Sequence, residues 1–412
     1  MTTPKGEIKQ LKDKLSSLKR ARRFIRWGES AGLARELRNV LQQIEEQVDD
    51  PQIGCELVAN FYTTDRSVFD RCDDSSGHVG DVYRFDAQEL FLSYASRYAD
   101  KNQLAKLVLK TSLKDDYGVR DALVNSAAEF LLEEQLRWLI EQFQKLANTE
   151  SDEFARRHWH YQVESLARQL KDPQLFEKTR LAAWGTDLPT AGKIDIAEAY
   201  LESGDEHTAL SWLEKISETE NYQREKQDKL LLTIYGRLGD SEKQREVACR
   251  SFRRQRSRLL FEEWLVIAGH DQNSTFLAEE IQVILNTPLL SLTDAAFLTD
   301  MEQYDAAESY LQARAEQLNG DYYQHLLPLA ETFESLSRPL TASLLYRALL
   351  DSILHRGQTK TYGHGARYLH KLDLLAKTVS DWKEMKPHAE YAAKIKQTHG
   401  RKTSFWARYE KL

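Results

Sequence analysis

The chain has 412 residues, of which 41% are hydrophobic and 29% charged, and its formal net charge is −7. This length allows a sizeable core, arranged as two or three domains or as one elongated solenoid. The negative charge gives no global attraction to nucleic acid or to anionic membranes. The sequence lacks both a run of about 18 apolar residues, which a membrane-spanning helix needs, and the apolar core of a signal peptide.

The composition predicts an all-α fold. Glycine (18) and proline (8) are scarce, so few residues are available for the turns that a sheet needs, and strong helix formers dominate. The three cysteines, Cys55, Cys72 and Cys249, are widely spaced and form no C-x-x-C pair. We therefore expect reduced thiols and a cytoplasmic protein.

Residues 5–26 are predicted to form a basic amphipathic helix, with one stripe that includes Leu11, Leu15 and Leu18. Its basic face would serve as an arm that docks on nucleic acid or a partner, or simply face solvent. After a break at Trp27 and Gly28, a second helix runs from Leu33 through Ile44 until Asp50-Pro51 ends it. Residues 1–50 form the first predicted segment.

Helical periodicity continues through a predicted bundle at residues 51–150. The expected helices lie at 53–62, 85–98, 102–113, 119–130 and 134–146. A polar stretch at 148–153 is taken as the boundary to a repeat region at 151–412, where helices at 154–170 and 174–184 form the first pair.

Two helical hairpins at 194–255 set the repeat pattern. Each has a Gly-Asp turn, at Gly204 and Gly239, and these turns lie 35 residues apart, close to the roughly 34-residue period of tetratricopeptide repeats. The second helices recur with steps of 35, 34, 29 and 35 at Ala209, Gln244, Ala278, Ala307 and Ala342. Such hairpins must stack to bury their apolar stripes, which predicts an α-solenoid of antiparallel helix pairs of the TPR or HEAT type.

The stretch 69–81 contains four carboxylates together with Cys72 and His78. Its oxygens are suitable ligands for a divalent cation, but the EF-hand spacing would place Cys72 and Tyr83 where carboxylates are required. The alternative is a capped turn in which Asp and Ser bind backbone N–H groups, with Asp81 or Asp86 capping the following helix. Residues Asp73, Asp74, Asp81 and Arg84 are therefore candidate binding residues.

Two further stretches are basic. Five arginines lie between Arg250 and Arg258, where they would bind phosphate or pair with acidic residues of neighbouring repeats. His364, Arg367 and Lys371 fall at helical spacing, so they would share one face of a helix that suits an anion. We expect residues 399–406 to pack back onto this helix through Phe405 and Trp406, bringing His399, Arg401 and Lys402 into one basic pocket with it.

These stretches carry a resemblance. Three motifs resemble those of a bacterial family of uncharacterised helical proteins. The first is Cys72–Asp81, with Asp73, Asp74, Ser75, Gly77, Val79 and Gly80. The others are Tyr362-Gly-His-x-Ala-Arg-Tyr-Leu and, later, His399-Gly-Arg-Lys-x-x-Phe-Trp. A related C-terminal region occurs in proteins with a SWIM-type zinc finger. This chain lacks that finger's Cys-x-Cys and Cys-x-His ligands, so the resemblance implies neither zinc nor direct DNA binding.

The sequence as a whole predicts a scaffold or adaptor that binds protein partners on a concave repeat surface, without a cofactor, a metal ion, a membrane or a catalytic residue. The first alternative is a nucleic-acid-associated accessory protein that uses the basic helices. The second is a metal-dependent enzyme centred on Asp73, Asp74 and Asp81.

Overall fold

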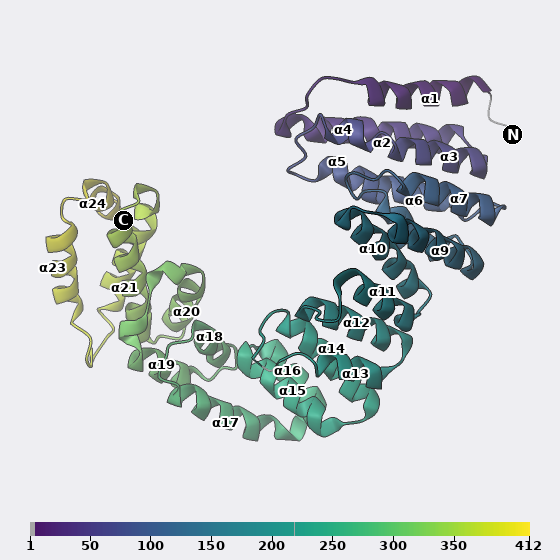
Figure 1. Cartoon of the computed structure of the whole chain (residues 1–412). Helices are drawn as coiled ribbons and strands as arrows, with labels where there is room; N and C mark the ends of the chain where they lie inside the picture. The colour runs from purple at the N-terminus through teal and green to yellow at the C-terminus, as the bar shows by residue number, and fades with distance from the viewer. Residues whose placement is uncertain (1–4, 218) are drawn as a thin grey trace. The chain divides into compact units, whose positions relative to one another are not determined.

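A computed structural model of the chain describes residues 5–217 and 219–412, and within these ranges it contains helices and no strand. Successive helices pack side by side as antiparallel pairs, so the predicted all-α helical-repeat architecture is confirmed (Figure 1). The chain forms two compact units, Met1–Leu230 and Leu231–Leu412. The predicted segments 1–50, 51–150 and 151–412 divide it differently and stay predictions.

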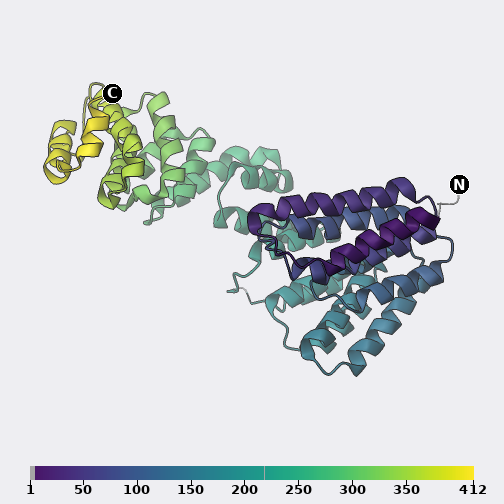
Figure 2. The ribbon, with the colours of Figure 1, turned by 90° about the horizontal axis from the view of Figure 1, so that it is seen from above.

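The first unit contains one helix after another with short connections, and Figure 2 shows its first helix lying along the face of the next ones. Its helices are α1 (Lys5–Arg20), α2 (Ser30–Gln47), α3 (Pro51–Tyr62), α4 (Asp65–Phe69), α5 (His78–Asp81), α6 (Ala87–Ala95), α7 (Lys101–Ser112), α8 (Asp121–Asn125), α9 (Glu133–Thr149), α10 (Glu153–Gln169), α11 (Pro173–Trp184), α12 (Thr190–Ser203) and α13 (Glu206–Leu213).

The boundary between the two units falls within α14 (Arg224–Leu238). The second unit continues with α15 (Ser241–Arg254), α16 (Arg258–Ala268), α17 (Asn273–Asn286), α18 (Leu292–Asp300), α19 (Tyr304–Ala313), α20 (Tyr323–Ser335), α21 (Pro339–Arg356), α22 (Tyr362–Leu375), α23 (His388–His399) and α24 (Thr403–Tyr409). None of the described helices is long and apolar enough to cross a membrane.

The Gly-Asp turns form as the sequence predicts. Gly204 ends α12 in the left-handed conformation with φ +89°, which a residue with a Cβ rarely adopts. Asp205 then caps α13 by accepting a hydrogen bond from the Thr208 N–H at 3.0 Å. The second turn repeats this arrangement, since Gly239 has φ +72° and Asp240 accepts from the Lys243 N–H at 3.1 Å.

The N-terminal helix is shorter than predicted. It ends at Arg20 and not at residue 26, because the chain then extends and pairs with the Asp-rich stretch. Ile25 donates its N–H to the Arg71 carbonyl at 2.7 Å and accepts from the Asp73 N–H at 2.9 Å, which makes an isolated parallel bridge with Cys72. The backbone of this segment therefore obtains its hydrogen bonds from a partner more than 40 residues away.

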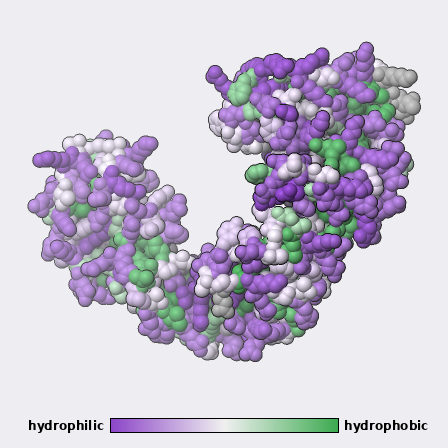
Figure 3. All heavy atoms as spheres, viewed as in Figure 1, coloured by the Kyte–Doolittle hydropathy of each residue, from purple (hydrophilic) through white to green (hydrophobic). Residues whose placement is uncertain are grey.

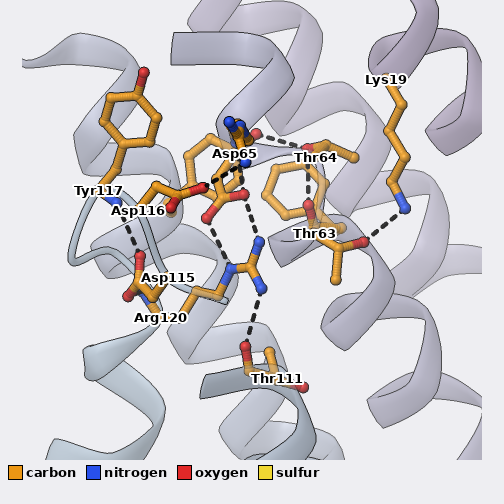
Figure 4. A network of polar contacts seen from close by, with 12 residues as sticks. Lys19, Thr63, Thr64, Asp65, Thr111, Asp115, Asp116, Tyr117 and Arg120 are labelled. Atoms are coloured by element: carbon orange, nitrogen blue, oxygen red, sulfur yellow. Dashed lines mark hydrogen bonds and ion pairs between the residues drawn. The ribbon is translucent and has the colours of Figure 1, made fainter. Parts of the chain in front are cut away.

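A buried ion pair joins three helices of the first unit (Figure 4). Asp65, at the start of α4, is fully buried and binds both Nε and Nη2 of Arg120, at 2.7 and 2.6 Å. Arg120 precedes α8 and donates its third nitrogen, Nη1, to the Thr111 carbonyl in α7 at 3.0 Å. The forked guanidinium thus satisfies groups from two elements while the carboxylate holds it in place.

Removing one partner of this pair should be costly. We expect Asp65→Ala to lower the free energy of unfolding by about 3–5 kcal/mol, because Arg120 would remain buried as an uncompensated charge. Urea unfolding followed by circular dichroism measures the change. The combined replacement Asp65→Leu with Arg120→Met should restore much of the loss.

The control is Arg137→Ala, which breaks a pair with Glu133 whose side chains are 55% and 67% exposed. Its cost should stay below about 1 kcal/mol. Equal effects of Asp65→Ala and Arg137→Ala would contradict a structural role for the buried pair.

Candidate functional site

In the Asp-rich stretch, the structure shows a helix cap. Asp74 accepts hydrogen bonds from the N–H groups of Val79 and Gly80, at 2.9 and 2.8 Å, at the first turn of α5. Gly77 precedes this turn with φ +77°. The carboxylate is therefore held by the two backbone donors of a helix end, as expected for a cap.

The other predicted residues of this stretch have different surroundings. Asp73 accepts from the N–H and hydroxyl of Ser75, and these bonds lower the pKa of Asp73. Arg84 is exposed. Its Nη1 lies close to Gly80, because a Cβ added to Gly80 would be 2.9 Å from this nitrogen and 3.4 Å from the Asp74 carboxylate. The structure thus brings Asp74 and Arg84 together over Gly80.

The prediction that Asp81 or Asp86 caps the following helix is wrong. The helix already begins at His78 and continues through a π-helical segment, η2 (Val82–Asp86), into α6. Both aspartates therefore lie inside a continuous helix, where the N–H groups they would cap are already bonded, and neither makes a capping bond. Asp86 pairs instead with Arg38 of α2 at 2.9 Å.

Among the described residues, no group of three or more His, Cys, Asp or Glu side chains is placed to hold a metal ion. The carboxylates of Asp73 and Asp74 are engaged with Ser75 and with the start of α5. The metal-dependent alternative therefore has no assembled ligand set at this stretch.

The basic stretch at 250–258 pairs with acidic residues of its own unit. Glu280 of α17 is fully buried, and both Arg253 and Arg256 bind it; the distance from Arg256 Nη2 is 3.0 Å. Arg256 also binds Asp294 of α18 at 3.2 Å. These contacts agree with the interpretation that the stretch joins neighbouring repeats, and they leave Arg256 only 10% exposed at its side chain.

The C-terminal segment packs back onto α22, as predicted. Phe405 is fully buried, with its ring centroid 5.9 Å from that of Tyr362. Gly365 allows this approach, because a Cβ there would lie 3.2 Å from the Phe405 ring. The Trp406 indole N–H donates to the His399 carbonyl at 3.0 Å, which ties α24 to the end of α23.

The basic residues of this region form two groups. In one group, Arg367 Nη2 lies 3.1 Å from His364 Nδ1 on the exposed face of α22. In the other, Lys402 lies near the Tyr362 ring, 5.8 Å from its centroid, and close enough to His399 to help lower its pKa, after desolvation as the main cause. Arg401 is exposed. The described contacts do not join the two groups, so the single basic pocket stays a prediction.

Asp373 was missed as an important residue of this region. It accepts from the Tyr409 hydroxyl at 2.5 Å and lies 2.7 Å from His388 Nε2, so that one carboxylate of α22 holds both α23 and α24. In the sequence, Asp373 only ends the family-like pattern that begins at Tyr362, and nothing there assigns it a contact. Its two partners follow 15 and 36 residues later, and no local pattern indicates them.

A second feature missed by the sequence is an exposed aromatic face on α10 and α11. Phe154 and Tyr161, seven residues apart on α10, are 82% and 46% exposed, and Trp184 at the end of α11 is 51% exposed. Arg157 lies between the two α10 residues in sequence and places its guanidinium 4.1 Å from the Trp184 ring centroid. Residues Phe154, Arg157, Tyr161 and Trp184 are called the α10–α11 aromatic face below.

Comparison with protein families gives a match along nearly all of the chain. The sequence pattern of one family of unknown function, DUF6880, matches residues 2–184 and 188–408. The chain belongs to the DUF6880 family. A search of curated proteins found no match.

The family match includes the Asp-rich stretch, the α10–α11 aromatic face and the C-terminal segment up to residue 408. Membership in DUF6880 supports the resemblance to an uncharacterised family and adds no reaction, ligand or partner. The function must therefore be argued from the surfaces and contacts of this chain.

The cap at Asp74 leads to a test that separates capping from metal binding. We expect Asp74→Ala to lower the free energy of unfolding by about 0.5–2 kcal/mol, because two N–H groups lose their acceptor. Asp81→Ala, inside the helix, should cost less than about 0.5 kcal/mol. Calcium should not raise the melting temperature of either variant or of the wild type. Calcium stabilisation lost in both variants would instead indicate a metal site.

The buried C-terminal aromatic gives a second test. Phe405→Ala should lower the free energy of unfolding by about 3–5 kcal/mol, since it leaves a cavity against Tyr362 and Gly365. The same chemical change at the 82%-exposed Phe154 should cost less than about 0.5 kcal/mol. Deleting residues 399–412 should also lower the melting temperature in a thermal scan. An unchanged melting temperature would mean that the segment does not stabilise the fold in solution.

Proposed function

We propose that this protein is a cytoplasmic, TPR-like helical-repeat scaffold that binds a protein partner through the α10–α11 aromatic face. The observation that carries the proposal is the exposure of three large aromatic side chains around Arg157 on two adjacent helices. Most aromatic residues of the first unit are buried between helices, as Tyr62, Tyr83 and Phe143 are. Side chains left outside such a core are available to a partner.

The composition of this face suits a protein interface. Trp, Tyr and Phe with Arg are enriched at protein interfaces, and Trp, Tyr and Arg dominate the residues that contribute most binding energy. The Arg157 side chain also binds Glu153 and stacks on Trp184, so it is already ordered before a partner arrives. The partner would offer apolar side chains to the rings and an acidic group to Arg157. Figure 3 shows hydrophobic residues among hydrophilic ones on the visible face of each unit.

A nucleic-acid partner has less support. Arg253 and Arg256, the residues expected to contact phosphates, bind the buried Glu280, and Arg258 binds Glu262 at 2.8 Å. Releasing them would leave Glu280 buried without its counter-charge. The basic face of α1 remains exposed at Lys9, Lys12 and Lys14.

The resemblance of the C-terminal region to SWIM zinc-finger proteins extends the proposal. We include in it a relationship between the two C-terminal regions, and neither zinc nor direct DNA contact, because the ligand pattern of that finger is missing. A partner bound along a concave surface of the repeats also remains part of the proposal.

The proposal is tested by affinity purification from the native host followed by measurement with the purified partner. Phe154→Ser combined with Trp184→Ser should weaken binding of that partner by at least about 30-fold, as the loss of two central aromatic anchors does. The melting temperature should fall only slightly, because Phe154 is largely exposed and Trp184 loses little more than its stacking with Arg157. Isothermal titration calorimetry gives the dissociation constants.

The control is Tyr222→Ser, which removes an aromatic side chain that is 61% exposed and lies outside the α10–α11 aromatic face. Binding by this variant should equal that of the wild type. Equal binding by the double variant would place the interface elsewhere. A different result would overturn the proposal: nucleic acid co-purifies with the chain, and all co-purified proteins are lost after nuclease treatment. That result would favour the nucleic-acid-associated alternative.

A further inference from the structure

The second unit contains a cavity of about 690 Å³ between α21, α23 and the short helix η6 (Gly320–Tyr322). This volume is within the range of small-molecule sites in proteins. All of its lining residues lie between Leu318 and His399, so the cavity belongs to one unit.

Arg347 of α21 lines this cavity and is 7% exposed. Its guanidinium is stacked between the rings of Trp382 and Tyr391, with centroid distances of 4.7 and 4.5 Å. Within the described part of the chain, Nη1 has one acceptor, the Lys386 carbonyl at 2.7 Å, whereas Nε and Nη2 have no hydrogen-bond partner. Two donors without acceptors on a buried cation lower the stability of the fold. The same two nitrogens can bind the two oxygens of a carboxylate or phosphate in a bidentate manner.

The side chains that line the cavity carry more positive than negative charge. Four permanent cations, Arg347, Arg356, Lys386 and Lys394, face two carboxylates, with His355 and His399 in addition. Both carboxylates are already engaged. Asp321 pairs with Arg356 at 3.4 Å. Asp351 accepts from the Tyr391 hydroxyl at 2.7 Å.

Asp351 is open to the cavity, yet the protein around it partly desolvates its carboxyl, and this desolvation raises the pKa of Asp351. Desolvation likewise lowers the pKa of Arg347. Both shifts have the same cause, the partial loss of hydration at the charged groups of the lining. An anion entering this environment would interact more strongly with Arg347 than it would in water.

The loop at residues 382–386 lines two cavities. Met385 and Leu344 line this cavity and also a second one of about 410 Å³, to which Trp382, Lys383 and Glu384 contribute. Nε and Nη2 of Arg347 are shielded from solvent. A ligand reaches these nitrogens only after neighbouring side chains move, and the second cavity leaves room for residues 382–386 to do so.

We propose that the Arg347 cavity is a binding site for an organic anion whose carboxylate or phosphate group accepts hydrogen bonds from Nε and Nη2 of Arg347. Lys394 and Lys386 supply further positive charge, and the rest of the ligand fills the volume between α21 and α23. The shared oxyanion chemistry has two sources: a free metabolite anion, or an acidic side chain on a peptide. This site is independent of the α10–α11 aromatic face, which lies in the other unit.

The test titrates the full chain with three probes at low salt: inorganic phosphate, citrate and a hexaglutamate peptide. Isothermal titration calorimetry gives affinity, and tryptophan fluorescence reports the ring stacked on Arg347, with Trp382→Phe to assign the signal. We expect saturable binding of at least one probe. Binding of phosphate or citrate identifies a free anion as the source, and binding of hexaglutamate alone identifies an acidic segment.

The variants decide the role of Arg347. Arg347→Met keeps a long apolar side chain between the rings and should weaken binding at least tenfold, because the charge-assisted hydrogen bonds to the anion are lost. Lys394→Gln, on the exposed side of α23, should weaken it about two- to fivefold and reduce its salt dependence. Lys396→Gln changes a neighbouring exposed lysine outside the lining and should leave the affinity unchanged.

Two results would overturn the proposal. The first is that none of the three probes binds the wild type at concentrations up to about 10 mM, which would leave the buried guanidinium with a packing role only. The second is binding that Arg347→Met and Lys394→Gln leave unaltered. If Arg347→Met unfolds, Lys394→Gln and Lys396→Gln still provide the comparison.

Discussion

The first unit depends on one buried charge. Asp65 is fully buried at the start of a helix of five residues, and Arg120 binds it while also donating to the Thr111 carbonyl of α7. Burying a carboxylate lowers the stability of the fold unless a cation and backbone donors replace the hydration that it loses. The pair therefore fixes where α4, α7 and α8 must lie. Thr64, next to Asp65, extends the constraint by sharing a hydrogen bond of 2.7 Å with the Tyr83 hydroxyl in the π-helical segment.

Much of this architecture could be predicted from local sequence. The Gly-Asp turns at 204 and 239 have a mechanism that acts within five residues, since glycine accepts the left-handed conformation and aspartate caps the next helix. Amphipathic periodicity likewise places α9, α10 and α11 within a few residues of their predicted bounds. Predictions were wrong where distant chain segments decide. The N-terminal helix stops early because Ile25 pairs with Cys72, which lies 47 residues further along the chain.

The candidate sites show the same limit. Burial of Phe405 could be predicted because two large aromatic residues in a short segment need a surface to cover them. The stacking of Arg347 between Trp382 and Tyr391 could not, since these residues come from a helix, a loop and another helix that share no sequence pattern. The exposed α10–α11 aromatic face was missed for the opposite reason. Phe154 and Tyr161 fit an amphipathic pattern as core residues, and only the packing of neighbouring helices decides which apolar residues remain outside.

The pairing of Asp65 with Arg120 also has a consequence for synthesis on the ribosome. The two residues are 55 positions apart. At about 5–20 residues per second, Asp65 is made roughly 3–11 seconds before Arg120 exists. During that interval α3 and α4 can form as helices, but their buried face holds a carboxylate without its counter-ion. The ion pair can therefore close only after Arg120 has been made, so the packing that buries Asp65 is completed after that point.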